Sequence, residues 1–492
     1  MEENKSKTSL KMNLVYQMCY RILVLLTPFI TSPYISRVLG ADALGEYSFI
    51  LSVVNYFVMI AYLGIDNYGC RIIAETRGEN NQSKLRKTFW EVYFLQAITG
   101  LVALCVYCIY CLVFIVGDKT LFLIQGLAVI GATIDINWYF AGSERFKLTV
   151  TRNTVIKLTT VCLIFLLVKE QKDLILYALI MVMGNVLSQV VMWGFLRKEL
   201  TFERVSFNGI FSHMKPNIAL FIPVIAVSVY HTMDKTMLGI LSDYTNTGYY
   251  YNADKIISMP LGMITGLGTV FLPRMANIVS NSGMDAGRNL LKKSFELHFA
   301  IACAMSFGIA AVSNNFIPWF FGEEFIPCIS LIKVFAPILI IKTLSGILQT
   351  QLLIPTNNER IYTRATFSGA FINLILNFAL IPKYGAMGAT IGTFGAELFV
   401  LTVESVQSIK LFNIFTQIKS NIIYCVAGIA MFIGIVVIDK VICFTYFMNL
   451  IIEVVAGGII YISIISVYIY TNKESVFNNV LNGRFRSIKK VE

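Results

Sequence analysis

The chain has 492 residues, 56% of them hydrophobic and only 14% charged, and its mean hydropathy is +0.69. Soluble domains are roughly 45–50% apolar and about 25% charged, so this composition excludes a water-soluble globular protein. The net charge is +11. The basic residues recur in short segments between apolar stretches instead of forming one patch, which argues against nucleic-acid binding.

Apolar segments follow one another along almost the whole chain, and a membrane-spanning helix needs about 20 such residues. The predicted fold class is all-α, a polytopic membrane protein with about 14 transmembrane helices. No connection is long enough to form a soluble catalytic domain. The predicted helices cover 12–37, 44–72, 88–116, 120–142, 147–168, 174–196, 210–240, 247–277, 290–316, 327–353, 361–381, 385–409, 419–438 and 442–470.

Loop charges predict the orientation. Every second connection is basic, as in the segment with Arg77, Lys84, Arg86 and Lys87, whereas the connections between them carry fewer or balanced charges. Lys and Arg are enriched in cytoplasmic loops, so both termini are expected to be cytoplasmic. The first apolar stretch is too long for a signal peptide and has no small-residue cleavage site, so we expect it to stay as the first spanning helix.

Cysteine and histidine give no sign of a metal centre. Cys105, Cys108 and Cys111 form a C-x2-C-x2-C run like part of an iron–sulfur motif, but no fourth cysteine follows at the right distance. The run lies in an apolar segment, which favours packing between helices. The three histidines lack metal-ligand spacing, so solvated or packing roles are expected.

Several short motifs occur in a characteristic order. They are TSPYISRVLG at 31–40 followed by GEYS at 45–48, GIDNYGCR at 64–71, DKTMLG at 234–239, FLPR at 271–274, NLILN at 373–377 and IPKYGAMGA at 381–389. Together they resemble the polysaccharide transporter family, the Wzx-type oligosaccharide flippases. That family belongs to a superfamily with the multidrug-and-toxin exporters and the lipid II flippase. The resemblance covers about residues 12–410.

This resemblance implies an architecture and a substrate. The architecture is two six-helix bundles around a central cavity plus two C-terminal helices, with domains at 1–205, 206–412 and 413–492. The implied substrate is an undecaprenyl diphosphate-linked oligosaccharide, moved from the inner to the outer leaflet of the bacterial inner membrane. Membrane lipids and other polysaccharide-assembly proteins are the expected partners, and nucleic acid is not.

Cations inside apolar segments are the candidate substrate-binding residues. A charged side chain in a helix centre costs about 2.5–3.5 kcal/mol on insertion scales, which suggests a wet cavity or a partner. Arg21 lies well inside the first apolar segment and suits a diphosphate; the alternative is snorkelling to the cytoplasmic surface or an ion pair. The other candidates lie nearer helix ends, where lipid anchoring is an equal alternative: Arg37, Arg71, Lys235, Lys255 and Arg274. For Asp234 and Lys235 a structural pair is the favoured interpretation.

Energy coupling is expected to be secondary, because the sequence has no phosphate-binding G-x-x-x-x-G-K-[ST] loop. No cofactor is predicted, and a proton or sodium gradient is the expected driving force. Asp66, Asp135 and Glu397, with Glu404, are the candidate coupling residues, and structural hydrogen bonding is their alternative role.

Two functional alternatives stay open. A multidrug exporter or the lipid II flippase belongs to the same superfamily, and an exporter of cationic drugs would favour an acidic or apolar cavity. A membrane polysaccharide polymerase, which is an enzyme, would need a long external loop with catalytic residues. No predicted external connection exceeds roughly ten residues, so we expect a transporter and not an enzyme.

Overall fold

The computed structural model describes residues 2–79, 81–196 and 201–471, without the side chains of 2–22, 25, 222–224, 226–227, 231 and 269–270. All regular elements in these ranges are helical, with no strand among them, which confirms the all-α prediction. The chain divides into two compact units, Met1–Gly239 and Ile240–Glu492. The domain boundaries at 205 and 412 stay predictions.

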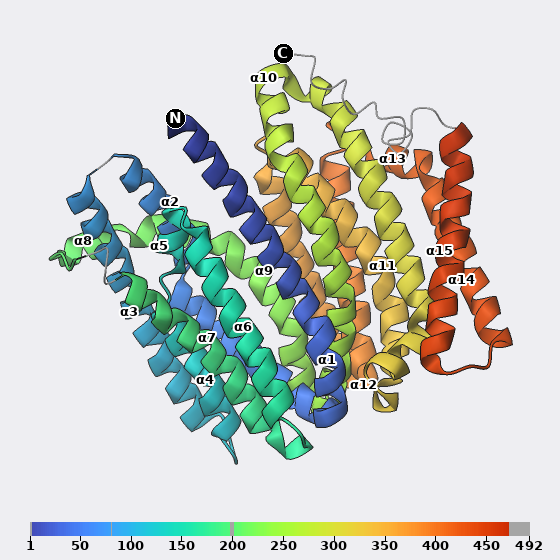
Figure 1. Ribbon diagram of the computed structural model, residues 1–492, viewed down its shortest axis with the longest axis horizontal. Helices are drawn as coiled ribbons and strands as arrows, with labels where there is room; N and C mark the ends of the chain where they lie inside the picture. Colours follow the sequence, from blue (N-terminus) through green and yellow to red (C-terminus); the bar gives the residue numbers. More distant parts are fainter. Residues whose placement is uncertain (1, 80, 197–200, 472–492) are drawn as a thin grey trace. The chain divides into compact units, whose positions relative to one another are not determined.

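The first unit contains nine helices in its described part (Figure 1). Helix α1 packs on α3, α4 and α6, and α4 and α6 both pack on α7. The elements are α1 (Glu2–Tyr62), α2 (Ile65–Gly78), α3 (Gln82–Val113), α4 (Thr120–Thr133), α5 (Asn137–Gly142), α6 (Phe146–Leu167), α7 (Leu174–Leu196), α8 (Phe207–Ser212) and α9 (Met214–Leu241).

The second unit is built around one long helix, α10, which packs on α11, α12, α14 and α15. A π-helical turn at Leu348–Leu353 follows α11 directly. The elements are α10 (Tyr244–Phe320), α11 (Cys328–Ile347), α12 (Glu359–Gln407), α13 (Ile414–Ser420), α14 (Ile422–Val441) and α15 (Tyr446–Thr471).

Three helices are far longer than one membrane crossing, and each is interrupted at a glycine. The breaks are at Gly40 in α1, Gly283 in α10 and Gly385 in α12, all with positive φ. At Gly385 a Cβ would lie 2.6 Å from the Asn246 side-chain oxygen, which accepts the Ala386 N–H at 3.0 Å. Each break falls in or beside a predicted connection, so the long helices correspond to pairs of predicted spans. The count of fourteen stays a prediction.

Two predicted helices are broken in their interior, and those predicted at 210–240 and 419–438 cross the α8–α9 and α13–α14 junctions near their starts. The helix predicted at 44–72 is broken at Leu63 and Gly64, which both have positive φ. The helix predicted at 120–142 is broken between Thr133 and Asn137. There the Gln96 amide donates to the carbonyls of Ala132 and Asp135 at 2.6 and 2.9 Å, so a buried side chain satisfies the interrupted backbone. Hydropathy over a window of about 20 residues does not show these breaks, because apolar residues continue on both sides of them.

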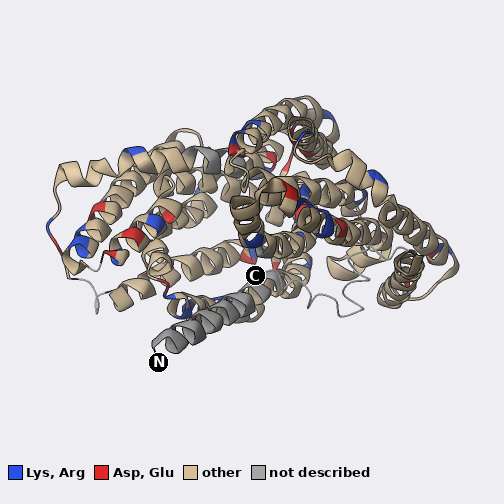
Figure 2. Ribbon diagram, turned by 90° about the horizontal axis from the view of Figure 1, so that it is seen from above, with Lys and Arg blue, Asp and Glu red and all other residues tan. Residues whose placement is uncertain are grey.

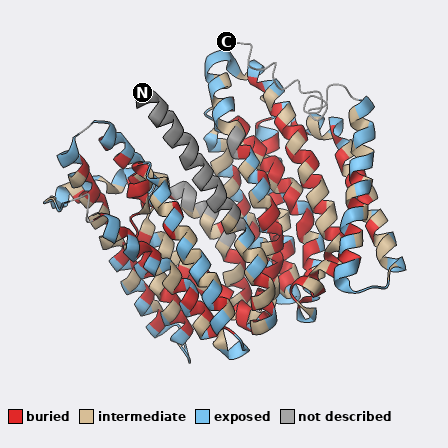
Figure 3. Ribbon diagram, viewed as in Figure 1, coloured by how far each residue is buried: buried red, intermediate tan, exposed pale blue. Residues whose placement is uncertain are grey.

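The exposed faces are apolar, as expected for helices that face lipid. Ten helices in the described residues are long and apolar enough to cross a membrane. On α14 the exposed residues recur every three to four positions, and Figure 3 shows exposed segments along α14 and α15. The exposed apolar positions of α14 are Ile422, Val426, Ile429, Ile433, Val437 and Val441. Figure 2 shows charged residues as isolated segments on mostly uncharged helices. The chain is therefore a multi-pass membrane protein.

Candidate functional site

The first unit contains a cavity of about 320 Å³ between α1, α6 and α7. Its described lining includes one lysine and no acidic residue. The polar lining residues are Thr27, Thr31, Asn153, Lys157, Thr160, Asn185 and Ser188. A volume in the usual range of ligand pockets, about 300–1,000 Å³, makes it a candidate binding site.

Lys157 supplies the charge of this cavity. It lies near the middle of α6 and is half-buried. No hydrogen bond or ion pair joins its ammonium group to the described residues, so it differs from a lysine held in a structural ion pair. Because a membrane-embedded cation is costly without a partner or water, its position favours an anionic ligand in the cavity.

Arg152, five residues before Lys157 on α6, holds the adjacent side of the cavity in place. Its side chain is buried, and its guanidinium donates to the Asn153 Oδ1 at 2.6 and 3.0 Å and to the Ser188 carbonyl at 2.9 Å. Asn153 lines the cavity with its Oδ1 already occupied by these donors. Its Nδ2 hydrogens therefore stay available as donors.

A second chain of hydrogen bonds orients Asn185, so that its amide oxygen, like that of Asn153, accepts from a protein donor. Arg152 also donates to Asn137 Oδ1 at 2.9 Å, and Asn137 Nδ2 donates to Gln189 Oε1 at 3.1 Å. Gln189 Nε2 in turn lies 3.5 Å from Asn185 Oδ1. Both cavity amides thus have their oxygen atoms engaged. With Lys157, they give the cavity a set of donors suited to phosphate oxygens.

Asp135, a predicted coupling residue, lies close behind this wall. It is 3% exposed, and its carboxylate accepts from the Tyr62 hydroxyl and the Asn137 backbone N–H, both at 2.7 Å. Asn137 therefore connects Asp135 to Arg152 and hence to the cavity. Asp66 lies in the first turn of α2 and is exposed.

The predicted substrate-binding cations are dispersed in the structure. Arg21 belongs to α1, but its side chain lies outside the described residues. Arg37 is exposed on α1, and Lys235 is half-buried on α9. Arg71 is exposed and pairs with Glu75, one turn along α2, at 2.8 Å. None of these predicted cations whose side chains are described lines the first-unit cavity. Their role in substrate binding stays a prediction.

In the second unit, Lys255 lies 3.9 Å from the centre of the Tyr251 ring, and Arg274 is exposed on α10. Glu397 is 6% exposed and forms an ion pair with Lys342 of α11 at 2.8 Å, a partner 55 residues away that no sequence pattern indicates. Glu404 is fully buried, and it accepts from Gln349 Nε2 at 2.8 Å. Both carboxylates thus have partners, as expected for residues with a structural role. Their role in ion coupling stays a prediction.

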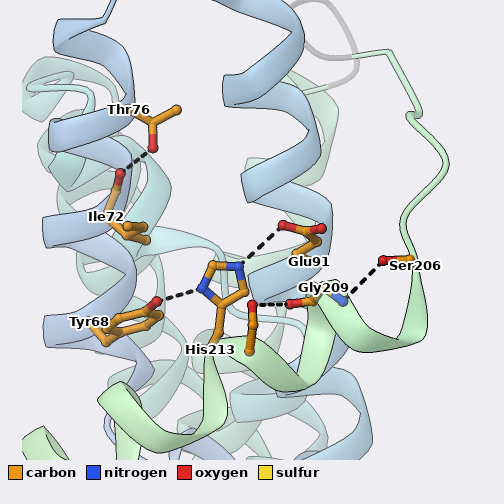
Figure 4. Close-up of polar contacts among 8 residues, drawn as sticks. Tyr68, Ile72, Thr76, Glu91, Ser206, Gly209 and His213 are labelled. Atoms are coloured by element: carbon orange, nitrogen blue, oxygen red, sulfur yellow. Dashed lines mark hydrogen bonds and ion pairs between the residues drawn. The ribbon is translucent and has the colours of Figure 1, made fainter.

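A histidine clamp, formed by Tyr68, Glu91 and His213, holds the segment between α7 and α9 (Figure 4). The Tyr68 hydroxyl lies 2.5 Å from His213 Nδ1, and His213 Nε2 lies 3.3 Å from Glu91 Oε2. All three side chains are largely buried. The clamp joins α2, α3 and the end of α8, so His213 has a structural role.

Gly209 of α8 allows the clamp to close, and this gives a first prediction. A Cβ at Gly209 would lie 2.1 Å from Glu91 Oε1. We expect Gly209→Ala to displace the Glu91 carboxylate and to destabilise the protein by about 1–3 kcal/mol, as other overpacking substitutions do. The thermal unfolding midpoint of the purified protein measures this. Gly194→Ala in α7 is the matched control, because no atom lies within 4 Å of its added Cβ. Equal midpoints for the two variants would contradict the prediction.

Sequence comparison agrees with this architecture. Residues 10–279 match the family described as polysaccharide biosynthesis protein. The chain belongs to this family. The match covers more than half of the chain and includes all the residues that form the first-unit cavity and the histidine clamp.

Curated relatives of this polysaccharide biosynthesis family member are transport proteins by name. A protein of Escherichia coli (strain K12) named as an O-antigen transporter is 22% identical over 404 residues, which cover 81% of this chain and 97% of the relative. A low-salt glycan biosynthesis flippase of Haloferax volcanii is 23% identical over 349 residues, covering 69% and 71% of the two chains.

Solved structures show the same fold. The lipid II flippase MurJ in an inward closed conformation has a TM-score of 0.75 at 15% identity, covering 94% of this chain and 99% of its own. An inward-facing multidrug resistance transporter of the MATE family has a TM-score of 0.59 at 13% identity, covering 82% and 99%. These likenesses establish the transporter fold and leave the substrate to be argued from the site.

Proposed function

We propose that the chain is a flippase that moves undecaprenyl diphosphate-linked oligosaccharide units from the inner to the outer leaflet for cell-surface polysaccharide assembly. The observation that carries the proposal is Lys157, a membrane-embedded cation without a described partner in a cavity that has no acidic lining residue. Membership of the polysaccharide biosynthesis family and the names of the relatives support the same substrate class.

The cavity offers complementary groups for a diphosphate and for sugars. Lys157 and the amides of Asn153 and Asn185 can donate to phosphate oxygens. The hydroxyls of Thr31 and Thr160 donate to carbonyls of their own helices at 3.0 and 2.9 Å, so their oxygens can accept from sugar hydroxyls. The lipid tail would stay in the bilayer, against the apolar outer faces, while the polar head group crosses.

A multidrug exporter is the second candidate, because its fold is similar. Cationic drugs would need carboxylates, whereas the described cavity lining presents the cation Lys157, no carboxylate and a single aromatic ring, that of Tyr177. The site chemistry therefore favours the lipid-linked anion. We assign the protein a transport role and not an enzymatic one.

The energy source and the cellular membrane are also part of the proposal. An ion gradient would drive alternating access, with Asp135 the best placed acid in the first unit because Asn137 and Arg152 connect it to the cavity. Asp66 and Glu397 are further candidates. The protein would reside in the bacterial inner membrane, with both termini in the cytoplasm, among other polysaccharide-assembly proteins.

The proposal is tested by removing the protein from its host cell. We expect a diphosphate-linked oligosaccharide to accumulate on the inner leaflet, together with loss of one surface polysaccharide. Mass spectrometry of extracted lipids identifies the intermediate, and lectin labelling of right-side-out and inverted vesicles reports its leaflet. An unchanged pool of such lipids would refute the proposal.

A further inference from the structure

The second unit contains a small cavity of about 40 Å³, bounded by α10, α11 and the π-helical turn. Its lining includes Gly268 and His298, which lie on either side of the Gly283 break, together with Lys342, Thr350 and Gln351. A cavity of this size holds a single water molecule, provided that polar groups surround it.

Three polar atoms converge on one point of this cavity. A Cβ built on Gly268 would lie 3.8 Å from both His298 Nε2 and Gln351 Nε2, and 4.0 Å from Thr350 Oγ1. His298 and Gln351 are 1% and 2% exposed, and neither nitrogen has a hydrogen-bond partner within the described part of the chain. Buried polar atoms are rarely left unsatisfied, so their convergence indicates a ligand.

The donor and acceptor pattern suits a water molecule. His298 Nδ1 lies 2.7 Å from the Ser294 carbonyl oxygen, which can only accept, so Nδ1 carries a hydrogen and the neutral ring accepts at Nε2. The Thr350 hydroxyl donates to the Gly346 carbonyl at 2.7 Å, which leaves its oxygen as an acceptor. Gln351 Nε2 is a donor. A bound water can accept from Gln351 and donate to His298.

Lys342 connects this cavity to a buried carboxylate. It lines the cavity, and its Nζ lies 2.8 Å from Glu397 Oε1, with only 19% and 7% of the two side chains exposed. The charged groups around His298 are then Lys342 and Glu397, with Glu404 beyond them on α12 and Glu296 on α10 itself. Glu296 accepts from the Tyr424 hydroxyl at 2.8 Å.

We propose that this cavity is the proton-binding site that couples transport to a proton gradient, with His298 accepting the proton through one bound water. The Nε2 lone pair takes one proton from the aqueous phase, so the group of His298, Lys342 and Glu397 changes from neutral to a charge of +1. Glu397 then lies near two cations, which alters the interaction that holds α12 to α11. This inference rests on the proposed function only where it assigns the proton a role in transport. The cavity and its contacts do not depend on that function.

The geometry favours a proton over a sodium ion. Sodium requires several oxygen ligands, whereas two of the three atoms that converge in this cavity are nitrogens, His298 Nε2 and Gln351 Nε2.

The test is a titration of the full-length protein labelled with ¹⁵N-histidine in lipid nanodiscs. The chain has three histidines, and His298→Gln assigns the signal of interest. We expect the His298 signal to change with pH in a single titration step. Glu397→Gln removes the neighbouring negative charge and should lower the titration midpoint by about one pH unit. Gly268→Ala fills the space facing both nitrogens and should abolish the titration.

The control is Glu359→Gln, an exposed acid at the start of α12, which should leave the midpoint unchanged. A His298 signal that does not titrate, or a midpoint unaffected by Glu397→Gln, would overturn the inference. So would signals that respond to sodium or chloride at constant pH instead of to pH. No lipid substrate is needed, so failure of the flippase proposal and failure of this one are separate outcomes.

Discussion

Lys157→Gln is expected to reduce delivery of surface polysaccharide by about tenfold or more, because it removes the cation of the first-unit cavity. A hydrogen bond to a charged group contributes about 1.5–3 kcal/mol, and each 1.4 kcal/mol is about tenfold in binding. The substituted amide keeps much of the volume and hydrogen-bonding capacity of the lysine. The measurement is surface polysaccharide in a deletion strain that carries the variant, at equal membrane abundance.

Two variants make this result specific. Lys157→Arg keeps the charge and should retain most of the activity. Lys172→Gln, at the exposed turn before α7, removes a charge of the same sign outside the cavity and should have no effect. Normal export by Lys157→Gln, or equal loss in Lys172→Gln, would remove Lys157 from the proposed site.

Arg152→Met is expected to destabilise the protein by about 1.5–3 kcal/mol or more, because a hydrogen bond to a charged group contributes about that much and Arg152 makes several. The substitution keeps an unbranched chain of similar reach but leaves Asn137, Asn153 and the Ser188 carbonyl without their donor. The cavity wall would lose its orientation together with its stability. The thermal midpoint of the purified protein and the amount of folded protein in the membrane measure the effect.

Arg71→Met is the matched control for stability, because the Arg71 side chain is 68% exposed and its pair with Glu75 is a surface pair. Surface substitutions usually change stability by less than about 0.5 kcal/mol. Comparable losses of stability in both variants would contradict the prediction. They would show that replacing any arginine destabilises the protein, whether or not it belongs to the network around Arg152.

Most of the fold is predictable from hydrophobicity. Apolar length predicts the spanning helices, and the glycine-containing connections near residues 40, 283 and 385 mark where long helices turn back. The breaks at Leu63–Gly64 and after Thr133 are not predictable in this way. They depend on tertiary partners such as Gln96, which supplies hydrogen bonds from another helix. The surface helices α8 and α13 are also too short to give a periodic signal.

The sequence indicates less of the candidate cavity. The rule that a cation inside an apolar helix marks function predicts a role for Arg21, and it applies equally to Arg152 and Lys157 in the helix predicted at 147–168. These two residues follow the basic residues Arg145 and Lys147 closely, so charge alone does not separate them from the loop. The donors of Asn153 and Asn185 depend on hydrogen bonds between three helices, so no sequence pattern could indicate them.

The most direct test of the central claim uses vesicles that contain only this protein and a labelled undecaprenyl diphosphate-linked oligosaccharide. Lectin accessibility reports which leaflet the sugar occupies. The account predicts that the wild-type protein moves the sugar across the bilayer in response to an imposed ion gradient, and that Lys157→Gln does so about tenfold more slowly. Transport of cationic drugs without movement of the lipid-linked sugar would contradict it.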